Sequence, residues 1–151
     1  MFKKTNSNTN NLPADSASVE RVTSVLGPGI NWKGNLQGIP GVRIGIRIEG
    51  TYEGSSLIIN GMIVVGESGK VYCQNIRADN VVVGGTVWGN ITARKLEILS
   101  TGRVTGNVVA EKEGFSTQEG AFLQGQILIQ DQVMIFPQMG VNRYPPGMPG
   151  R

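Results

Sequence analysis

Few side chains in this sequence have the type and spacing that a chemical site requires. The run from Gly66 to Lys70, GESGK, imitates a phosphate-binding loop, but Val64 stands where the first glycine belongs and Val71 follows the lysine. Such a loop needs that first glycine to wrap its backbone around the phosphates, and a serine or threonine hydroxyl after the lysine to hold magnesium. The sequence therefore predicts no nucleotide binding.

The other reactive groups do not form a catalytic set. The chain has no histidine and one cysteine, Cys73. Histidine is the commonest general base and metal ligand, and one cysteine makes neither an internal disulfide nor a cysteine-rich zinc site. We expect Cys73 to be a small buried residue in a reducing compartment. We predict no catalytic residues, no cofactor and no metal site.

Carboxylate pairs are the last catalytic candidates. Glu49 lies four residues before Glu53, and Glu111 lies two residues before Glu113. Paired carboxylates can perform acid–base catalysis, but only where a pocket brings them to one substrate. Charged neighbours surround both pairs, so we interpret them as a solvated surface and predict that the protein is not an enzyme.

The distribution of charge argues against nucleic acid as a partner. The net charge is +3, yet residues 30–136 contain nine Lys and Arg against nine Asp and Glu, so the ends carry the excess. Nucleic-acid-binding domains concentrate positive charge on a folded face. The chain also lacks a run of ~20 apolar residues, and polar residues follow Lys4 where a signal peptide would be apolar. We expect a cytoplasmic protein.

Composition divides the chain into three parts. Residues 1–26 are rich in Asn, Ser and Thr and are predicted to be a flexible tail. Residues 137–151 contain much Pro and Gly and are predicted to be a disordered tail. Residues 27–136 remain as one folded domain. The stretch Ser18–Leu26 has some apolar content, which fits an entry strand or a half-turn of helix, and it receives no assignment.

The folded part carries an internal repeat. A signature of the form Gly-x-apolar-x-Gly recurs from positions 34, 50, 69, 85, 102 and 121, with Cys73 and Ala121 as exceptions to the glycines. Between signatures, stretches such as Val42–Ile48 alternate apolar and polar residues, which is typical of strands with one buried face. Further apolar clusters include Val133 and Ile135. At about 3.3 Å per residue, roughly 17 residues make one three-sided coil. We predict an all-β, three-sided β-helix of about six coils.

Equivalent residues of successive coils should stack on one another, because a single coil cannot bury its own apolar face. The middle residues of the signatures are therefore predicted to form one buried column: Leu36, Tyr52, Val71, Val87, Val104 and Leu123.

The two end coils should be sites of self-association. Each leaves unpaired backbone groups beside apolar side chains, and no amphipathic capping helix is visible in the sequence. The predicted polymerisation interface comprises Ile30 and Trp32 at one end and Phe122, Leu123, Ile127 and Ile129 at the other.

The repeats resemble a known family. Gly85–Ile98 (GTVWGNITARKLEI) and its echo Gly102–Val108 (GRVTGNV) are similar to the bactofilins, polymer-forming cytoskeletal proteins of bacteria. The resemblance covers about residues 30–136. It implies a right-handed β-helix whose subunits meet head to head and tail to tail in a homopolymer. Such filaments are apolar, meaning that they have no overall direction, and they need no nucleotide.

The resemblance also implies a location and partners. Met1, Phe2, Lys3 and Lys4 look like the membrane-targeting start of many family members, so the polymer is expected at the inner face of the cytoplasmic membrane. There it would act as a scaffold for cell shape, with cell-wall enzymes or polarity factors as the expected clients.

Two other classes of protein share parts of this pattern. Left-handed hexapeptide-repeat acyltransferases also form triangular coils, but they keep near-exact 18-residue periods and use a histidine base, whereas the periods here run from 16 to 19 residues. A monomeric β-helix that serves as an adaptor or ligand-binding module fits the composition and remains the alternative. Electron microscopy of the purified protein distinguishes it from a filament.

Overall fold

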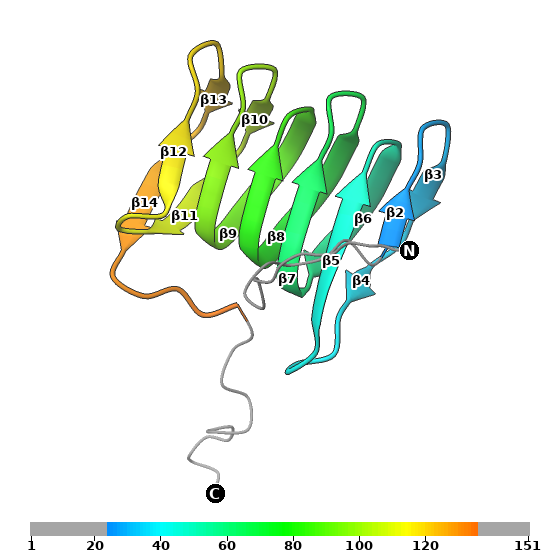
Figure 1. Cartoon of the computed structure of the whole chain (residues 1–151), viewed down its shortest axis with the longest axis horizontal. Helices are drawn as coiled ribbons and strands as arrows, with labels where there is room; N and C mark the ends of the chain where they lie inside the picture. The colour runs from blue at the N-terminus through cyan, green and yellow to red at the C-terminus, as the bar shows by residue number, and fades with distance from the viewer. Residues whose placement is uncertain (1–23, 136–151) are drawn as a thin grey trace, which may run out of the picture.

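A computed structural model describes residues 24–135, and every element in them is a β-strand (Figure 1). Within this part of the chain no helix is long and apolar enough to cross a membrane. The strands are β2 (Ser24–Leu26), β3 (Asn31–Lys33), β4 (Leu36–Gln37), β5 (Arg43–Ile48), β6 (Thr51–Ile58), β7 (Asn60–Val65), β8 (Lys70–Val83), β9 (Thr86–Ile98), β10 (Arg103–Thr105), β11 (Val108–Glu111), β12 (Phe115–Thr117), β13 (Phe122–Gln124) and β14 (Ile127–Gln130).

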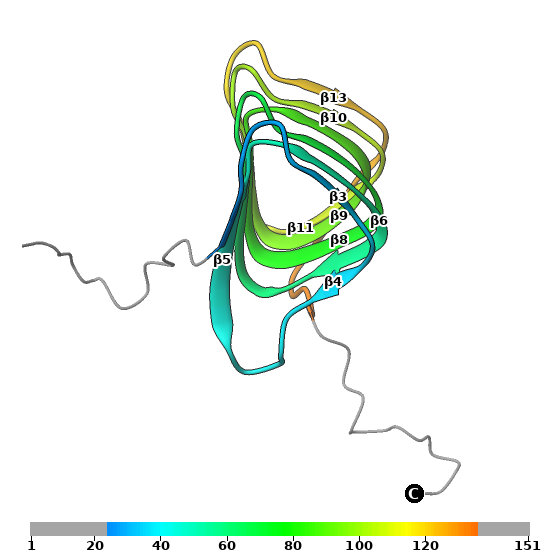
Figure 2. The same ribbon diagram turned by 90° about the vertical axis from the view of Figure 1, so that its right-hand side faces the viewer.

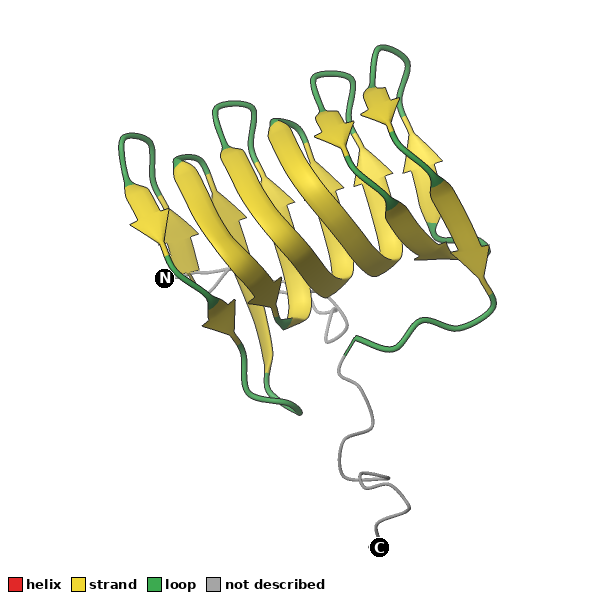
Figure 3. Cartoon of the chain, turned by 180° about the vertical axis from the view of Figure 1, so that it is seen from behind, coloured by secondary structure: helices red, strands yellow, loops and turns green. Residues whose placement is uncertain are grey.

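The strands wind into a right-handed solenoid with three faces, as Figures 1 and 2 show. All pairings between neighbouring coils are parallel, and the long strands β8 and β9 pass over all three faces (Figure 3). Face 1 contains β3, β10, β13 and the beginnings of β6, β8 and β9. Face 2 contains β4, β11, β14, the end of β6 and the middles of β8 and β9. Face 3 contains β2, β5, β7, β12 and the ends of β8 and β9. The predicted three-sided β-helix of about six coils is confirmed.

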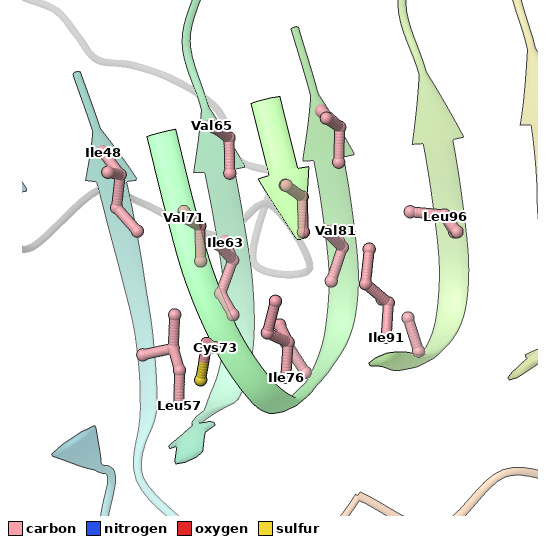
Figure 4. Close-up of a cluster of buried hydrophobic side chains, with 14 of the residues drawn as sticks. Ile48, Leu57, Ile63, Val65, Val71, Cys73, Ile76, Val81, Ile91 and Leu96 are labelled. Carbon is pink, nitrogen blue, oxygen red and sulfur yellow. The ribbon is translucent and has the colours of Figure 1, made fainter. Parts of the chain in front are cut away.

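The core is a set of columns that run along the solenoid. On face 3, for example, Ile46, Ile63, Val81 and Leu96 lie directly over one another and are buried. Figure 4 shows the labelled residues Val71, Ile76 and Val81, one from each face along β8, pointing into the interior. Stacked β-branched and leucine side chains suit a pleated surface with neighbours above and below.

The corner between faces 1 and 2 depends on glycine and asparagine. Gly89 has φ +146°, and a Cβ there would overlap the carbonyl oxygen of Cys73 in the coil before. One residue later the Asn90 Oδ1 accepts a hydrogen bond from the Asn107 N–H (3.0 Å), and the Asn107 Oδ1 accepts one from the Gln126 N–H (3.1 Å). These bonds satisfy backbone donors where the chain leaves the ladder.

Coil length varies, and the corners absorb the variation. Between β8 and β9 the register shifts after Tyr72, because three residues lead from Tyr72 to Asn75 while two lead from Trp88 to Asn90. The corner takes up the extra residue, so that equivalent positions of the two coils pair on the faces before and after it.

Three sequence predictions need correction. Strand β2 lies inside the segment predicted as a tail, because Ser24 and Leu26 pair with Ile46 and Ile48 of β5. The rest of that tail, and the tail predicted from residue 137, lie outside the described residues. The other two corrections concern the first coil and the end of the domain.

The first coil has a different register from the predicted one. Leu36 pairs with Leu57 on face 2, and Trp32 is the residue that pairs with Tyr52 on face 1. Gly34 closes the signature of this coil and does not open it, while Ile30 takes the leading place usually held by glycine. Leu36 therefore does not belong to the predicted column.

Val133 and Ile135 are buried, but they do not belong to a strand of a further coil. After β14 the chain turns back, and residues 131–135 run along the corner between faces 2 and 3 (orange in Figure 1). The alternation of apolar residues predicted a strand here because an extended segment lying in a groove has the same pattern.

Candidate functional site at the two end coils

The middle of the solenoid contains most of the predicted column. Tyr52, Val71, Val87 and Val104 stack in register on face 1 and are buried. The column ends on Leu123, which is partly buried in the last coil.

At the N-terminal end, β2, β3 and β4 have neighbours on one side only among the strands of residues 24–135. Trp32 is 41% exposed, although Tyr52 in the next coil of the same column is 2% exposed. Leu26 and Leu36 occupy the corresponding inward positions on faces 3 and 2 and are partly buried. Ile30 is half exposed in the turn that leads into β3. In the part of the chain that the structure describes, this end is therefore an apolar surface framed by unpaired strand edges.

At the C-terminal end, Ile127 and Ile129 continue two columns of face 2. Ile127 lies over Val108 and Ile129 lies over Ala110, and both of these partners are 0% exposed. Ile127 itself is 45% exposed. Because residues 131–135 turn back along the side, none of the described residues forms a seventh coil that would cover this end.

Phe122 lies in the last coil, as expected, but on its outer side. It pairs with Arg103, whose guanidinium carbon lies 5.6 Å from the centre of the phenyl ring, so both side chains are on the outside of face 1. Because side chains alternate along a strand, the inward position of Leu123 places Phe122 outward. Phe122 is therefore at the rim of the end coil.

Leu128 is one of the apolar residues that the sequence places at this end. It lies over Val109 on the outside of face 2, half exposed, between Ile127 and Ile129. Because side chains alternate along a strand, Leu128 is at the rim while Ile127 and Ile129 point inward.

The buried polar side chains in the core are held in their neutral forms. Burial raises the pKa of Tyr52 to about 12, and its hydroxyl donates a hydrogen bond to the Ser56 carbonyl (2.9 Å). Burial also raises the pKa of Cys73, whose Sγ donates to the Asn75 carbonyl (3.3 Å). Thiolate is the reactive form of cysteine, so this thiol is inert.

The remaining candidate groups are parts of the coil surface. Residues 66–69 form the turn between β7 and β8, Lys70 begins β8, and Ser68 Oγ donates to Glu49 Oε1 (3.0 Å). Arg47 donates to Glu49 (2.6 Å) and so lowers the pKa of that carboxyl. Among residues 24–135 no three His, Cys, Asp or Glu side chains gather as metal ligands would. Met1, Phe2, Lys3 and Lys4 lie outside the described residues.

Comparisons with known proteins agree with this geometry. The family profile described as "Bactofilin: Polymer-forming cytoskeletal" matches residues 24–128. Bactofilin BacP of Myxococcus xanthus (strain DK1622) is 31% identical over 117 residues, which are 77% of this chain and 45% of BacP. The chain thus spans about half the length of this curated relative.

Two solved structures are similar to the chain. One is the Thermus thermophilus bactofilin, reconstructed in double helical filaments, with a TM-score of 0.62, 28% identity and coverage of 71% of this chain and 99% of that one. The other is the cytoskeletal bactofilin BacA, solved by solid-state NMR, with a TM-score of 0.58 and 25% identity. The match covers 74% of this chain and 100% of the BacA chain.

Proposed function

Because this chain belongs to the bactofilin family of polymer-forming cytoskeletal proteins, we propose that it assembles end to end into a nucleotide-independent filament through its first and last coils. One observation carries the proposal. Residues that are buried in the inner coils have counterparts in the end coils, such as Trp32 and Ile127, that are nearly half exposed for lack of a neighbouring coil. A second subunit stacked on either end would supply that coil.

The filament is proposed to be apolar, with like ends meeting. In a two-fold contact each residue of the interface occurs twice, so one substitution is felt on both sides. The resemblance to the bactofilin family supports this symmetry. Averaged electron micrographs test it, because an apolar filament has two-fold axes perpendicular to its length and a head-to-tail filament has none.

Assembly is tested by a charge at the C-terminal end. Ile127→Arg would place two like charges in a contact between C-terminal ends, and we expect a folded monomer or dimer with no filaments in electron micrographs. Thr92→Arg, on the outside of face 2 in the middle of the solenoid, is the matched control and should leave filaments intact. Long filaments from Ile127→Arg would refute the interface. A monomeric wild-type protein would instead support the alternative of an adaptor or ligand-binding module.

We further propose that Phe2, Lys3 and Lys4 attach the filament to the inner face of the cytoplasmic membrane, where it serves as a scaffold for cell-shape or cell-wall factors. One Phe contributes ~1.5–3 kcal/mol and each Lys near anionic lipid about 1 kcal/mol, so a single tail binds weakly. Many tails on one filament raise the avidity by roughly 10²–10⁴-fold.

Co-sedimentation with anionic liposomes tests the attachment. Wild-type filaments should pellet with lipid, whereas Phe2→Ser filaments and unassembled Ile127→Arg protein should largely stay in solution. Equal pelleting of the wild type and Phe2→Ser at physiological salt would show that this tail is not the anchor.

A further inference from the structure

The segment after β14, residues 131–135, lies along the side of the solenoid and is here called the strap. It follows the corner between faces 2 and 3 from the last coil toward the N-terminal half (Figures 1 and 3). The Val133 N–H donates to Glu111 Oε2 (3.1 Å). Arg94 Nε donates to the Val133 carbonyl (3.3 Å), and Arg77 Nη1 donates to the Met134 carbonyl (3.2 Å). Two strap residues, Val133 and Met134, thus bond to three successive coils.

The corner beneath the strap is built from charged groups that hold one another. Asp79 is only 9% exposed, and its carboxylate contacts Arg43 Nη1 (2.6 Å) and Arg94 Nε (3.6 Å). Arg94 Nε also lies 3.8 Å from Glu111 Oε2. Because the Arg and carboxylate groups pair among themselves, the groove keeps its shape and donors without help from the strap.

Between the strap and this corner lies a cavity of about 610 Å³, which Asn60 and the Pro40–Gly41 turn also line. The strap therefore fills the groove only in part. The volume lies within the ~300–1,000 Å³ range of ligand pockets, so space remains for a larger occupant.

The strap binds as an extended peptide would. Each of the three hydrogen bonds joins a coil side chain to the strap's main chain, so none of them depends on the identity of a strap residue. Identity enters through alternate side chains, because Val133 and Ile135 are buried while Met134 between them is half exposed. Main-chain bonds combined with pockets for every second side chain are the usual means of recognising an extended peptide.

We propose that this groove is a binding site for an extended segment of a partner protein that carries two apolar residues separated by one, and that the strap is its internal competitor. The proposal does not depend on end-to-end assembly. The strap is bound by side chains rather than by the strand ladder, so its release leaves every coil paired. The groove lies on the side of the solenoid, where stacking of the ends would leave it open.

The strap competes strongly because it is tethered. A short tether gives an effective concentration in the millimolar range or above. A free peptide of equal intrinsic affinity therefore binds the wild-type protein poorly, and a partner must contribute further contacts or meet a weakened strap.

The test uses the full-length chain with a weakened strap, Val133→Ser/Ile135→Ser, and a fluorescent peptide with the sequence of residues 130–135 (QDQVMI). Fluorescence anisotropy should show the peptide binding this variant at least 10-fold more tightly than the wild type. A peptide with Ser in place of Val and Ile should not bind. Adding Arg94→Gln to the strap variant should weaken binding several-fold.

Two results would overturn the proposal. One is a strap variant that melts like the wild type but does not bind the peptide at millimolar concentration. The other is a wild type that binds it as tightly as the variant does, because the strap would then not compete.

If the strap variant does not fold, hydrogen exchange of the wild-type protein tests whether the strap detaches. The Val133 amide should exchange at least 100-fold faster than the Ile91 amide, which bonds to the Asn107 carbonyl in the ladder. Equal protection of the two amides would make the strap a fixed part of the core and refute the proposal.

Discussion

The inner coils and the end coils place the same kinds of residue at their inward positions, yet these side chains differ in exposure. Val108 and Ile127 occupy one column in adjacent coils, and so do Tyr52 and Trp32, but only the inner member of each pair is buried. The inner member has a coil on both sides and the outer member has a coil on one. Burial in this fold is therefore conferred by the neighbouring coil and not by the residue type.

The largest expected effect comes from a charge in an inner column. Val87→Asp would leave a carboxylate without a partner among close-packed apolar side chains, and we expect the chain not to fold, a loss of more than ~4 kcal/mol. Trp88→Asp is the matched control, because the next residue points outward, is half exposed and has its ring nearly perpendicular to that of Tyr72. It should cost about 1 kcal/mol or less by thermal melting. Similar losses for both variants would contradict the assigned orientation.

Truncating one side chain to alanine should cost more stability in an inner coil than in an end coil of the same column. Ile91→Ala should cost about 2–5 kcal/mol because it leaves a cavity in a fully packed column. Ile127→Ala should cost less than about 1.5 kcal/mol in unassembled protein, because the site is half exposed and can relax. Denaturant titration measures both. In filaments the difference should shrink, since a second subunit would bury Ile127, and an unchanged difference there would argue against burial of this end.

Glycine substitutions compare the same corner in two coils. Gly89 and Gly125 both have φ +146°, and a Cβ at either would overlap a carbonyl oxygen of the coil before. Gly89→Ala should cost about 1–3 kcal/mol through backbone strain. Gly125→Ala should cost less, because an end coil can fray locally without unfolding the rest. Equal losses of melting temperature would mean that the last coil does not open independently.

The last comparison concerns alkaline pH. Tyr52 has a folded-state pKa of about 12, above its ordinary value of about 10, so the unfolded chain loses this proton first. The free energy of unfolding should therefore fall as pH rises from about 10 to 12 and then level off. Tyr52→Phe should flatten the fall over that range. Cys73→Ala is the control for the thiol, whose pKa is also raised by burial. An unchanged slope in Tyr52→Phe would show that the hydroxyl is not buried.

Much of the fold could be predicted from the sequence because each coil of a solenoid carries the same sequence pattern. Five residues of the predicted column share one column in the structure, since the glycines around them recur wherever the backbone turns the same corner. The predicted register of the first coil was wrong for a physical reason. Gly34 and Gly38 imitate the signature, while the true one begins with Ile30, and the step from Trp32 to Tyr52 takes 20 residues because of an added turn at Pro40–Gly41.

The surfaces were harder to predict than the core. A periodic pattern identifies apolar residues, but their orientation follows only when the register is known. Ile127 points inward, whereas Phe122 points outward at the rim. The strap was inaccessible for another reason. Its groove is formed by Arg77, Arg94 and Glu111 from three different coils, and no local pattern links them to Val133.

The parallel pairing of complete coils has a mechanical consequence. Eleven residue pairs join β8 to β9 around three faces, and the ladder bonds between these coils lie along the solenoid axis. Tension applied evenly along the axis stretches all of these bonds at once, so they must fail together. A pull on the chain end after β14 would instead open the last coil one bond at a time. The molecule should thus withstand a higher force when it is pulled along the solenoid axis than when it is pulled by the chain end. Force spectroscopy with the two kinds of attachment would measure the ratio of the two unfolding forces.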